Sequence, residues 1–355
     1  MILRSLLLVC GMLLSGCSTF TYYLQSVGGH LQLVGHSRPV TSVLQDRDLS
    51  SRLRRQLELS QQIRDFASRQ LALPDNGSYR SYAQLNRKAV LWSVVATPRF
   101  SVEPRQWCYP VIGCASYRGY FSRESADGFG ADLRREGLDV AVEPVPAYST
   151  LGWFDDPLPS TVIGWPEGDL AGLIFHELAH QRLYLPDDSA FNEAFATAVQ
   201  RIGTERWFQA RNDRAGLRQW RQAQRRERQF VHLILQTRKR LQALYARTLT
   251  TEEMARKKAA AFRQLQREYV AMRKGWGAAP AFDGWMGRNL NNAHLALIAT
   301  YEEWEPAFRE LLARAGGDLP EFYRQAEALA RLSPEQRLRM LRELRVAARQ
   351  RGSVK

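Results

Sequence analysis

Two of the six histidines in the chain lie four residues apart around a glutamate, in the stretch HELAH that begins at His176 and ends at His180. On a helix this spacing directs both imidazoles to nearly the same face, with Glu177 beside them. Two neutral imidazoles and one carboxylate are the ligands of many catalytic zinc sites, in which a fourth position is left for water. Glu177 would then act as the general base that takes a proton from this water. The stretch therefore predicts one zinc ion per chain and hydrolytic chemistry.

The third ligand is expected on the next helix. Asp188 or Ser189 can cap a helix over the run AFNEAFATAVQRIG, which carries Glu193 among small residues and opposite a stripe of large apolar ones. A carboxylate among small residues suits a place where a second helix packs closely against the first. We therefore predict Glu193 as the third ligand. Asp187 and Asp188, in the connecting loop, are the rival candidates, and an exposed helical glutamate is the alternative without a function.

The residues around the motif are apolar, which favours a metal site over two ordinary core histidines. The letters LIF precede the motif, and LA separates Glu177 from His180. A buried helix that carries two histidines and a glutamate needs polar partners for all three. Arg182 departs from the apolar residue often found beyond the second histidine. Two core histidines with ordinary hydrogen bonds are the alternative interpretation.

The first residues have the pattern of an export signal. An apolar run from Leu6 to Leu14 follows one positive charge and precedes small residues and a cysteine, so residues 1–16 are expected to be a signal peptide. The end of this segment resembles the lipobox of bacterial lipoproteins, which predicts lipidation of Cys17; an ordinary cleaved signal is the alternative. Ser18 resembles an outer-membrane sorting signal. We therefore expect a lipid-anchored protein of the cell envelope, at the outer membrane and facing the periplasm.

Export leaves one pair of cysteines in the mature chain. Cys10 is removed with the signal and Cys17 carries lipid, so Cys108 and Cys114 remain together in an oxidising compartment. We expect a disulfide between them, which would stabilise the fold by roughly 2 kcal/mol for so short a loop. Their spacing is unlike that of a zinc site.

The chain carries a formal net charge of +14. An exported lipoprotein rarely meets nucleic acid, so no nucleic-acid partner is expected. Attraction to anionic lipid or to anionic polymers of the envelope is the more economical explanation. Solvated arginine-rich helices without any partner are the alternative for most of these charges.

Sequence patterns divide the mature chain into three parts. Helical periodicity dominates residues 17–90, whereas 91–204 combine strand-like stretches with the zinc-binding helices, and 205–355 are helical again. Two arginine-rich segments, about 205–246 and 251–274, predict a protruding helical hairpin. The expected fold class is α+β and mainly helical, with a small mixed or antiparallel sheet and the zinc helix packed beneath it.

The zinc motif and its downstream partner resemble a known group of enzymes. HELAH followed by NEAFA resembles the gluzincin metallopeptidases, in which two histidines and a glutamate on a second helix hold zinc. More narrowly, the words WCYPVIGCASYRGYF, AYSTLGWFDDPL and NNAHLALIATYEEW are similar to the predicted aminopeptidases among bacterial lipoproteins. These and related segments span residues 22–304. The resemblance implies a zincin-like fold, a peptide substrate, zinc on His176, His180 and Glu193, and Glu177 as the base.

The resemblance also implies a substrate-binding segment. AYSTLGWFDDP, which contains Tyr148, would form an edge strand that pairs with a peptide backbone. Asp155 and Asp156 at its end could hold the α-ammonium group of a peptide N-terminus. Turn capping before Pro157 is the alternative role for at least one of them.

A donor that stabilises the oxyanion of the transition state is also required. Tyr148, Tyr184, His294 and Tyr301 are the candidates. We favour His294 or Tyr301, because they are seven residues apart and share one face of a predicted helix. A core helix with an amphipathic tyrosine is the alternative.

These features predict a membrane-tethered zinc aminopeptidase. The rival within enzymes is an endopeptidase that acts on envelope proteins or cell-wall peptides and needs no anchor for an ammonium group. The rival outside enzymes is an envelope scaffold that binds zinc structurally and offers its basic hairpin to a partner. Glu177 argues against the scaffold, because a structural site has no use for a base at that position.

Overall fold

The computed structural model describes most of the chain, in residues 28–29, 33–109, 113–147, 149–277, 282–302 and 304–353. The expected signal peptide, Cys17 and Tyr148 lie outside these ranges, as does the side chain of Tyr301. The described chain is a mainly helical α+β protein with small mixed and antiparallel sheets, which confirms the expected class. Within the described ranges, every helix is too short or too polar to cross a bilayer.

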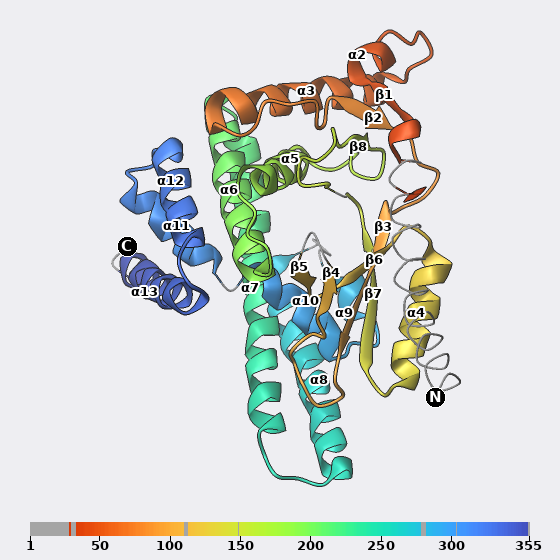
Figure 1. The fold of residues 1–355 in the computed structure, drawn as a ribbon, viewed down its shortest axis with the longest axis vertical. Helices are drawn as coiled ribbons and strands as arrows, with labels where there is room; N and C mark the ends of the chain where they lie inside the picture. The colour runs from red at the N-terminus through yellow and green to blue at the C-terminus, as the bar shows by residue number, and fades with distance from the viewer. Residues whose placement is uncertain are drawn as a thin grey trace, which may run out of the picture.

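The N-terminal part combines a long helix with a small mixed sheet (Figure 1). Strand β1 (Ser37–Pro39) pairs antiparallel with β2 (Ser81–Ala83), and β2 pairs parallel with β8 (Leu158–Pro159). Between β1 and β2 lie the short α2 (Val40–Val43) and α3 (Ser51–Leu71). The side chain of Ser50 caps α3, and Ala72 ends the helix in the left-handed conformation. The stretch expected to be helical therefore also contributes two strands.

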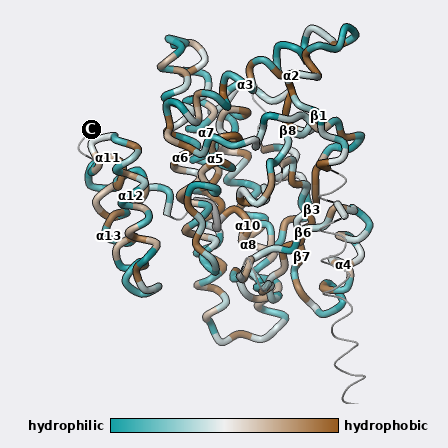
Figure 2. The backbone as a smooth tube through the Cα atoms, turned by 45° about the horizontal axis from the view of Figure 1, so that its top comes forward, coloured by the Kyte–Doolittle hydropathy of each residue, from teal (hydrophilic) through white to brown (hydrophobic). Residues whose placement is uncertain are grey.

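The second sheet is antiparallel and has helices on both faces. Its order is β6 (Arg118–Tyr120), β3 (Leu91–Thr97), β7 (Asp139–Val145). Successive side chains of a strand point to opposite faces. Accordingly, Val94 packs in one cluster with residues of α4 (Arg123–Arg135), while Val95 packs with Ala293 of α10 (Asn292–Glu302). The hydropathy colouring of Figure 2 shows the apolar character of β3 at the centre of this layer.

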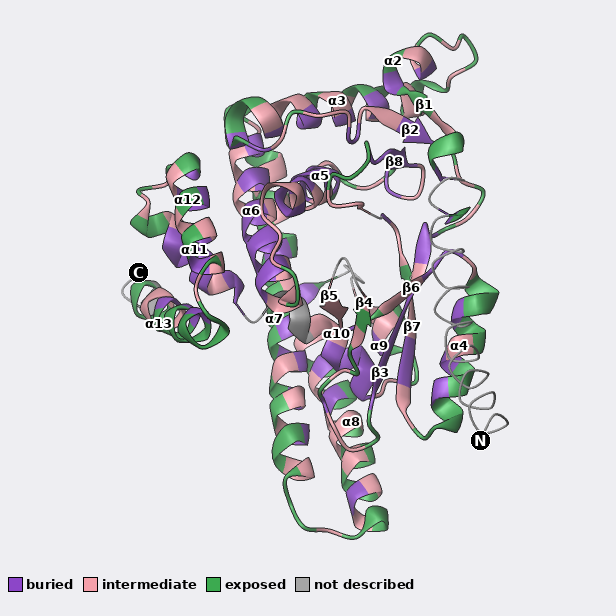
Figure 3. Ribbon diagram, viewed as in Figure 1, coloured by how far each residue is buried: buried purple, intermediate pink, exposed green. Residues whose placement is uncertain are grey.

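Two helices at the centre carry the zinc motif. They are α5 (Glu167–Arg182) and α6 (Ser189–Ala210), and they pack against each other along their length. Asp188 caps α6 by accepting a hydrogen bond from the N–H of Phe191, at 3.0 Å. Figure 3 shows α6 buried over most of its length. Helix α5 packs on α6 and α3 and shares one buried cluster with Tyr82 of β2 and Leu158 of β8, so the small sheet nearest the zinc helix is the mixed one. The two faces of the β3 sheet are occupied by α4 and α10.

The C-terminal part is helical. The two arginine-rich segments form the hairpin of α7 (Arg214–Tyr245) and α8 (Thr251–Arg273), which projects from the body of the molecule (Figure 1). The short helices η1 (Lys274–Trp276) and α9 (Asp283–Met286) return the chain to α10. The last three helices are α11 (Glu305–Arg314), α12 (Leu319–Ala330) and α13 (Pro334–Ser353). The aromatic ring of Phe195 on α6 packs against Phe308, Phe322 and Tyr323 of this group, so the C-terminal helices support α6 from behind.

The segment expected to be an edge strand is a turn instead. The described residues 149–157 contain no strand, and β8 begins only at Leu158. A carboxylate oxygen of Asp156 accepts a hydrogen bond from the N–H of Thr150, at 2.9 Å, and Leu151 and Gly152 have positive φ angles. A side chain that bonds to the backbone six residues earlier closes a compact turn, so an extended strand is excluded here.

One buried guanidinium holds the loop between α3 and β2. Arg64 is completely buried, and its Nε donates to the carbonyl of Ser78 at 2.8 Å. Its Nη2 donates to the carbonyls of Pro74 and Asn76, at 2.9 and 3.0 Å, and its Nη1 to the hydroxyl of Ser68 at 2.6 Å. The five donors of a guanidinium lie in a fixed plane, so one side chain can fix several carbonyls of an irregular loop.

We predict that Arg64→Lys lowers the free energy of unfolding by about 3 kcal/mol, because the ammonium cannot reach the same carbonyls and leaves some of them buried without a donor. Chemical denaturation of the two proteins measures the difference. Arg69→Lys on the same helix is the control, since the side chain of Arg69 is 76% exposed and its ion pair with Asp65 is long, at 3.7 Å. Equal effects of the two changes would contradict the role given to Arg64.

Candidate metal centre and active site

The three predicted metal ligands point their donor atoms at one another. His176 and His180 lie one turn apart on α5, and their Nε2 atoms are 3.1 Å apart. Glu193 reaches them from α6, with its Oε2 at 3.3 Å from the Nε2 of His176 and 3.6 Å from that of His180. These side chains form a group that could hold a metal ion. Sequence spacing and close packing of α5 on α6 together bring them to one point.

The distances fit a metal site. Bonds of about 2.0–2.1 Å in tetrahedral geometry place neighbouring ligand atoms roughly 3.3 Å apart, which agrees with all three separations. Among the described residues, the buried Oε2 of Glu193 has no hydrogen-bond donor, although it lies between two imidazoles. A carboxylate oxygen in this position is explained when a cation binds it. Imidazole and carboxylate ligands suit zinc, and they suit other divalent transition metals as well.

A glutamine from α6 orients one of the imidazoles. Gln200 lies seven residues after Glu193, on the same face of the helix, and its Oε1 is 3.1 Å from the Nδ1 of His176. With Nδ1–H donating to this oxygen, the Nε2 of His176 keeps its lone pair for a metal. Gly172 permits the close approach, since a Cβ there would lie 3.1 Å from the Cγ of Gln200. The sequence did not identify Gln200 as a functional residue.

The electrostatics of the group favour an ionised carboxylate. Burial alone would raise the pKa of Glu193, but the positive charge of His180 and the close contacts with both imidazoles lower that pKa to about 2. Burial would lower the pKa of His176, but Glu193 and Glu177 raise it. The carboxylate of Glu193 is therefore available as a negatively charged ligand at every physiological pH.

Glu177 is the residue of α5 between the two histidines, and it is half-buried. Two other ionisable side chains, Tyr79 and Asp156, lie close enough to feel its charge. Burial raises the pKa of Tyr79 well above its usual value, and the charges of Glu177 and Asp156 raise it further. Burial also raises the pKa of Asp156 to about 6, against a hydrogen bond from Thr150 and with a smaller contribution from Glu177. The expected base thus lies near two buried ionisable groups, Tyr79 and Asp156.

Tyr79 is a residue that sequence reasoning missed. It is completely buried, and its φ of 63° lies in the left-handed region, which is uncommon for residues other than glycine. Its N–H donates to the carbonyl of Asp156 at 2.6 Å, and the loop before it is held by Arg64. No spacing could have revealed it, because about a hundred residues separate Tyr79 from the zinc motif.

Gln181, next to His180, fastens the loop that carries Tyr79 to α5. Its Oε1 accepts a hydrogen bond from Asn76 at 2.8 Å, and its Nε2 donates to the hydroxyl of Ser78 at 3.1 Å. A Cβ on Gly152 would contact the same glutamine side chain at 3.4 Å. Two loops, one on each side, therefore meet at the end of the metal-binding helix.

The two aspartates predicted to bind substrate differ in exposure. Asp156 is fully buried and anchors the turn through Thr150, which confirms the capping role for one of the pair. Asp155 is exposed and lies against Gly77. Binding of an ammonium group by either remains a prediction. The turn also presents two large aromatic side chains to solvent, Trp153 and Phe154.

The candidate oxyanion donors are in different places. His294 is buried on α10, where it contacts Asn291, Glu143 and Trp285, and burial lowers its pKa. Within the described residues, none of these contacts is with the histidine–glutamate group. Tyr184, by contrast, lies near Glu193: burial raises its pKa first, and the charge of Glu193 raises it further. Tyr184 is thus close enough to feel the charge of Glu193, and the identity of the oxyanion donor stays a prediction.

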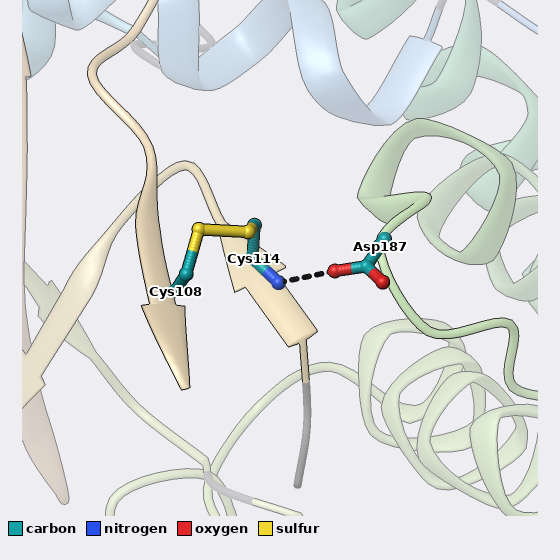
Figure 4. The surroundings of a disulfide bond; sticks show 3 residues. All are labelled: Cys108, Cys114 and Asp187. Atoms are coloured by element: carbon teal, nitrogen blue, oxygen red, sulfur yellow. Dashed lines mark hydrogen bonds between the residues drawn. A yellow bond between two sulfur atoms is a disulfide. The ribbon is translucent and has the colours of Figure 1, made fainter. Parts of the chain in front are cut away.

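A disulfide hairpin docks beside the metal-binding helices. Cys108 and Cys114 form the predicted disulfide between β4 (Trp107–Tyr109) and β5 (Gly113–Ala115). Figure 4 shows the N–H of Cys114 donating to the Oδ1 of Asp187, at 2.7 Å, in the loop between α5 and α6. Asp187 is thus engaged by the hairpin.

The other rival ligand is engaged as well. Asp188 caps α6 and accepts a hydrogen bond from Arg337 at 3.0 Å. Neither loop aspartate belongs to the metal-binding group, whose three members are His176, His180 and Glu193.

Comparison with known proteins gives one match. A family model described as "Putative aminopeptidase" matches residues 21–341 of the chain. No curated protein and no solved structure matches it.

We predict that the purified protein contains one metal ion per chain and that Glu193→Gln lowers the metal affinity by more than roughly 100-fold. Loss of a residue that only orients a ligand costs up to about that much, and loss of a ligand should cost more. The cause is loss of the only charged ligand in the group. Metal analysis after dialysis against a graded chelator measures the change. Glu205→Gln, the same substitution twelve residues later on α6, should retain the metal, and equal losses in both variants would contradict the assignment.

A second prediction concerns pH. The pKa of Asp156 is about 6 in the folded protein and 3.8 by its ordinary value. The folded state therefore binds this proton more tightly than the unfolded state does. The resulting contribution to the free energy of unfolding is complete below pH 3.8 and is lost as the pH rises through about 6. The unfolding free energy of the native protein relative to Asp156→Asn should fall by up to roughly 3 kcal/mol over this range.

Urea denaturation from pH 3.5 to pH 7 measures this difference. Asp155→Asn, the same change at the exposed neighbour, is the control. A difference between the native protein and Asp156→Asn that stays constant over the whole range would show that burial does not hold the proton on Asp156.

Proposed function

The chain belongs to the Putative aminopeptidase family, and from this premise we propose that it is a zinc metallopeptidase that hydrolyses the first peptide bond of its substrates. The single observation that carries the proposal is the convergence of His176, His180 and Glu193 with Glu177 on the same helix. A structural site would need the three ligands but not the glutamate between them. We also propose that α5 and α6 correspond to the two zinc-binding helices of a zincin-like fold.

In the proposed site, His176, His180 and Glu193 hold one zinc ion. Zinc when bound would lower the pKa of a water molecule to roughly 7 and polarise the carbonyl of the peptide bond. Gln200 fixes the tautomer of His176 through the hydrogen bond to its Nδ1.

Glu177 accepts a proton from the attacking water and later delivers it to the leaving amine. The oxyanion that forms needs a hydrogen-bond donor from the protein. Tyr184 is a candidate for this donor because it lies close enough to Glu193 for that charge to raise its pKa. His294 and Tyr301 remain candidates from the sequence. The half-buried position of Glu177 partly shields it from solvent while leaving it accessible to substrate.

The preference for peptide N-termini rests on negative charge near Glu177. Asp155 and Asp156 end the turn that meets α5 at Gln181, and a substrate ammonium group bound there would place the first peptide bond near the metal. Tyr148, which lies outside the described residues, stays in the proposal from the sequence. An endopeptidase acting on envelope proteins is the alternative, and it would need no such anchor.

The proposed location is the cell envelope. Lipid on Cys17 would tether the mature protein to the outer membrane on its periplasmic side, so peptides of the periplasm are the expected substrates. Two lines of support are the lipobox-like segment and the disulfide between Cys108 and Cys114, since disulfides persist in oxidising compartments. The basic α7–α8 hairpin would face anionic components of the envelope.

We predict that Glu177→Gln lowers kcat for peptide hydrolysis by about 100-fold or more while the metal content is unchanged, because the amide cannot accept the proton but is not a ligand. Hydrolysis of free and N-acetylated peptides, together with metal analysis, measures both properties. Glu58→Gln, an exposed position on α3, should leave both unchanged.

The outcome with blocked peptides separates the alternatives. Cleavage of free peptides only supports an aminopeptidase, whereas equal cleavage of acetylated peptides would replace it by an endopeptidase. Bound zinc without turnover on any peptide would point to the envelope scaffold. Full activity of Glu177→Gln would contradict the assignment of the base.

A further inference from the structure

A cavity lined by arginines lies on another face of the helix that supplies Glu193. Its volume is about 190 Å³, and its walls come from α6, α7 and α11. Arg201 of α6 lines it and directly follows Gln200, whose side chain contacts His176. Consecutive residues of an α-helix point about 100° apart, so the cavity and the metal group occupy different faces of α6.

Positive charge is in excess in this cavity. The lining contains one glutamate, Glu205, and these five arginines: Arg201, Arg221, Arg225, Arg228 and Arg309. Two more glutamates, Glu305 and Glu227, lie just behind the lining. Among the described residues at this cavity, the arginines therefore outnumber the glutamates by two.

The back of the cavity is built from buried and mutually bonded side chains. Arg201 is 6% exposed, and its Nε donates to the Oε1 of Gln224 at 3.1 Å. Its Nη1 is 3.4 Å from the carboxylate of Glu305, which also contacts Arg309 at 3.5 Å. Gln224 donates in turn to Glu227 at 2.9 Å. This arrangement fixes the inner guanidiniums, unlike arginines on a freely solvated helix.

Arg225 and Arg228 at the mouth are different. They lie three residues apart on α7, and both are exposed. Within the described part of the chain, neither makes an ion pair closer than 4 Å. The pKa of Arg228 is lowered, first by partial desolvation and then by the positive charges of Arg201 and Arg309. An anion bound among these arginines would relieve the repulsion between their like charges.

We propose that this cavity binds a dianionic phosphate group, with Arg225 and Arg228 as its principal ligands and Arg309 and Arg201 behind them. A phosphate monoester carries a charge of about −1.5 to −2 at pH 7. Arg225 and Arg228 make no ion pair with any described residue, so their guanidiniums are available to such an anion. The planar guanidinium donates two parallel hydrogen bonds to phosphate oxygens, and these charge-assisted bonds are stronger than neutral ones. The site is independent of the metal centre and of peptide hydrolysis.

Titration calorimetry with inorganic phosphate tests the site, using the full chain in a neutral detergent. We expect one saturable site per chain and affinity at least ten-fold weaker in the double variant Arg225→Gln/Arg228→Gln. The matched control is Arg256→Gln/Arg263→Gln, which removes the same charge from exposed positions on α8 and should bind phosphate within two-fold of the native protein. Neither pair of arginines is buried, so all three proteins should fold, and their thermal unfolding verifies this.

Absence of saturable binding to the native protein, or equal weakening in both double variants, would overturn the proposal, because the second result would reveal only the overall charge. Dihexanoyl phosphatidic acid, a water-soluble lipid with a phosphate monoester, identifies the source of the phosphate. Binding at least as tight as that of inorganic phosphate, and lost in Arg225→Gln/Arg228→Gln, supports a lipid headgroup. Binding of inorganic phosphate alone supports the same site with a soluble phosphate. Removal of the metal by a chelator should leave either affinity unchanged.

Discussion

A carboxylate buried between two imidazoles is the interaction on which the rest of the fold depends. Glu193 is ionised and lies in the interior, where an unpaired charge would cost several kcal/mol. Its partners His176 and His180 are on another helix, so α5 and α6 must pack closely and in one register. Gly172 permits that approach, and the aromatic cluster around Phe195 supports α6 from the opposite side. The central helix pair is therefore both the core of the protein and the frame of its candidate site.

Three segments far apart in the sequence meet at the C-terminal half of α5, and each is held by one polar anchor. Arg64 fixes the loop that carries Tyr79, Asp156 closes the turn after β7, and Asp187 receives the N–H of Cys114 in the disulfide hairpin. Each anchor satisfies backbone groups of irregular chain that would otherwise be buried without partners. Loops anchored in this way can hold side chains in fixed positions, although they have no repeating backbone hydrogen bonds. This explains how a residue with a strained backbone, Tyr79, is maintained next to Glu177.

The sequence predicted the parts of the site that depend on local periodicity. The spacing of His176 and His180 and the helical pattern around Glu193 are local properties, and the structure brings the three together as expected. The sequence did not reveal which sheet α5 lies nearest, because an apolar helix has no feature that identifies the sheet or helix that will cover it. The edge strand was wrong because Asp156 bonds to Thr150, a contact that composition does not show. Tyr79 was missed because its proximity arises only from tertiary packing.

Helix α6 contributes to two sites, a metal-binding group that needs a cation and an arginine-lined cavity that suits an anion. One face presents Glu193, an anion that needs a cation, and the next presents Arg201, in a cavity whose described lining contains five arginines and one glutamate. Gln200 lies between them in sequence and orients His176. Bonds among buried side chains fix the metal-binding group and the back wall of the cavity, so neither needs the other to form. The cell-envelope setting proposed from the N-terminus gives this arrangement a use, because a peptidase held by its own lipid and by phosphate groups at a second point would keep its metal centre in a constant orientation relative to the membrane.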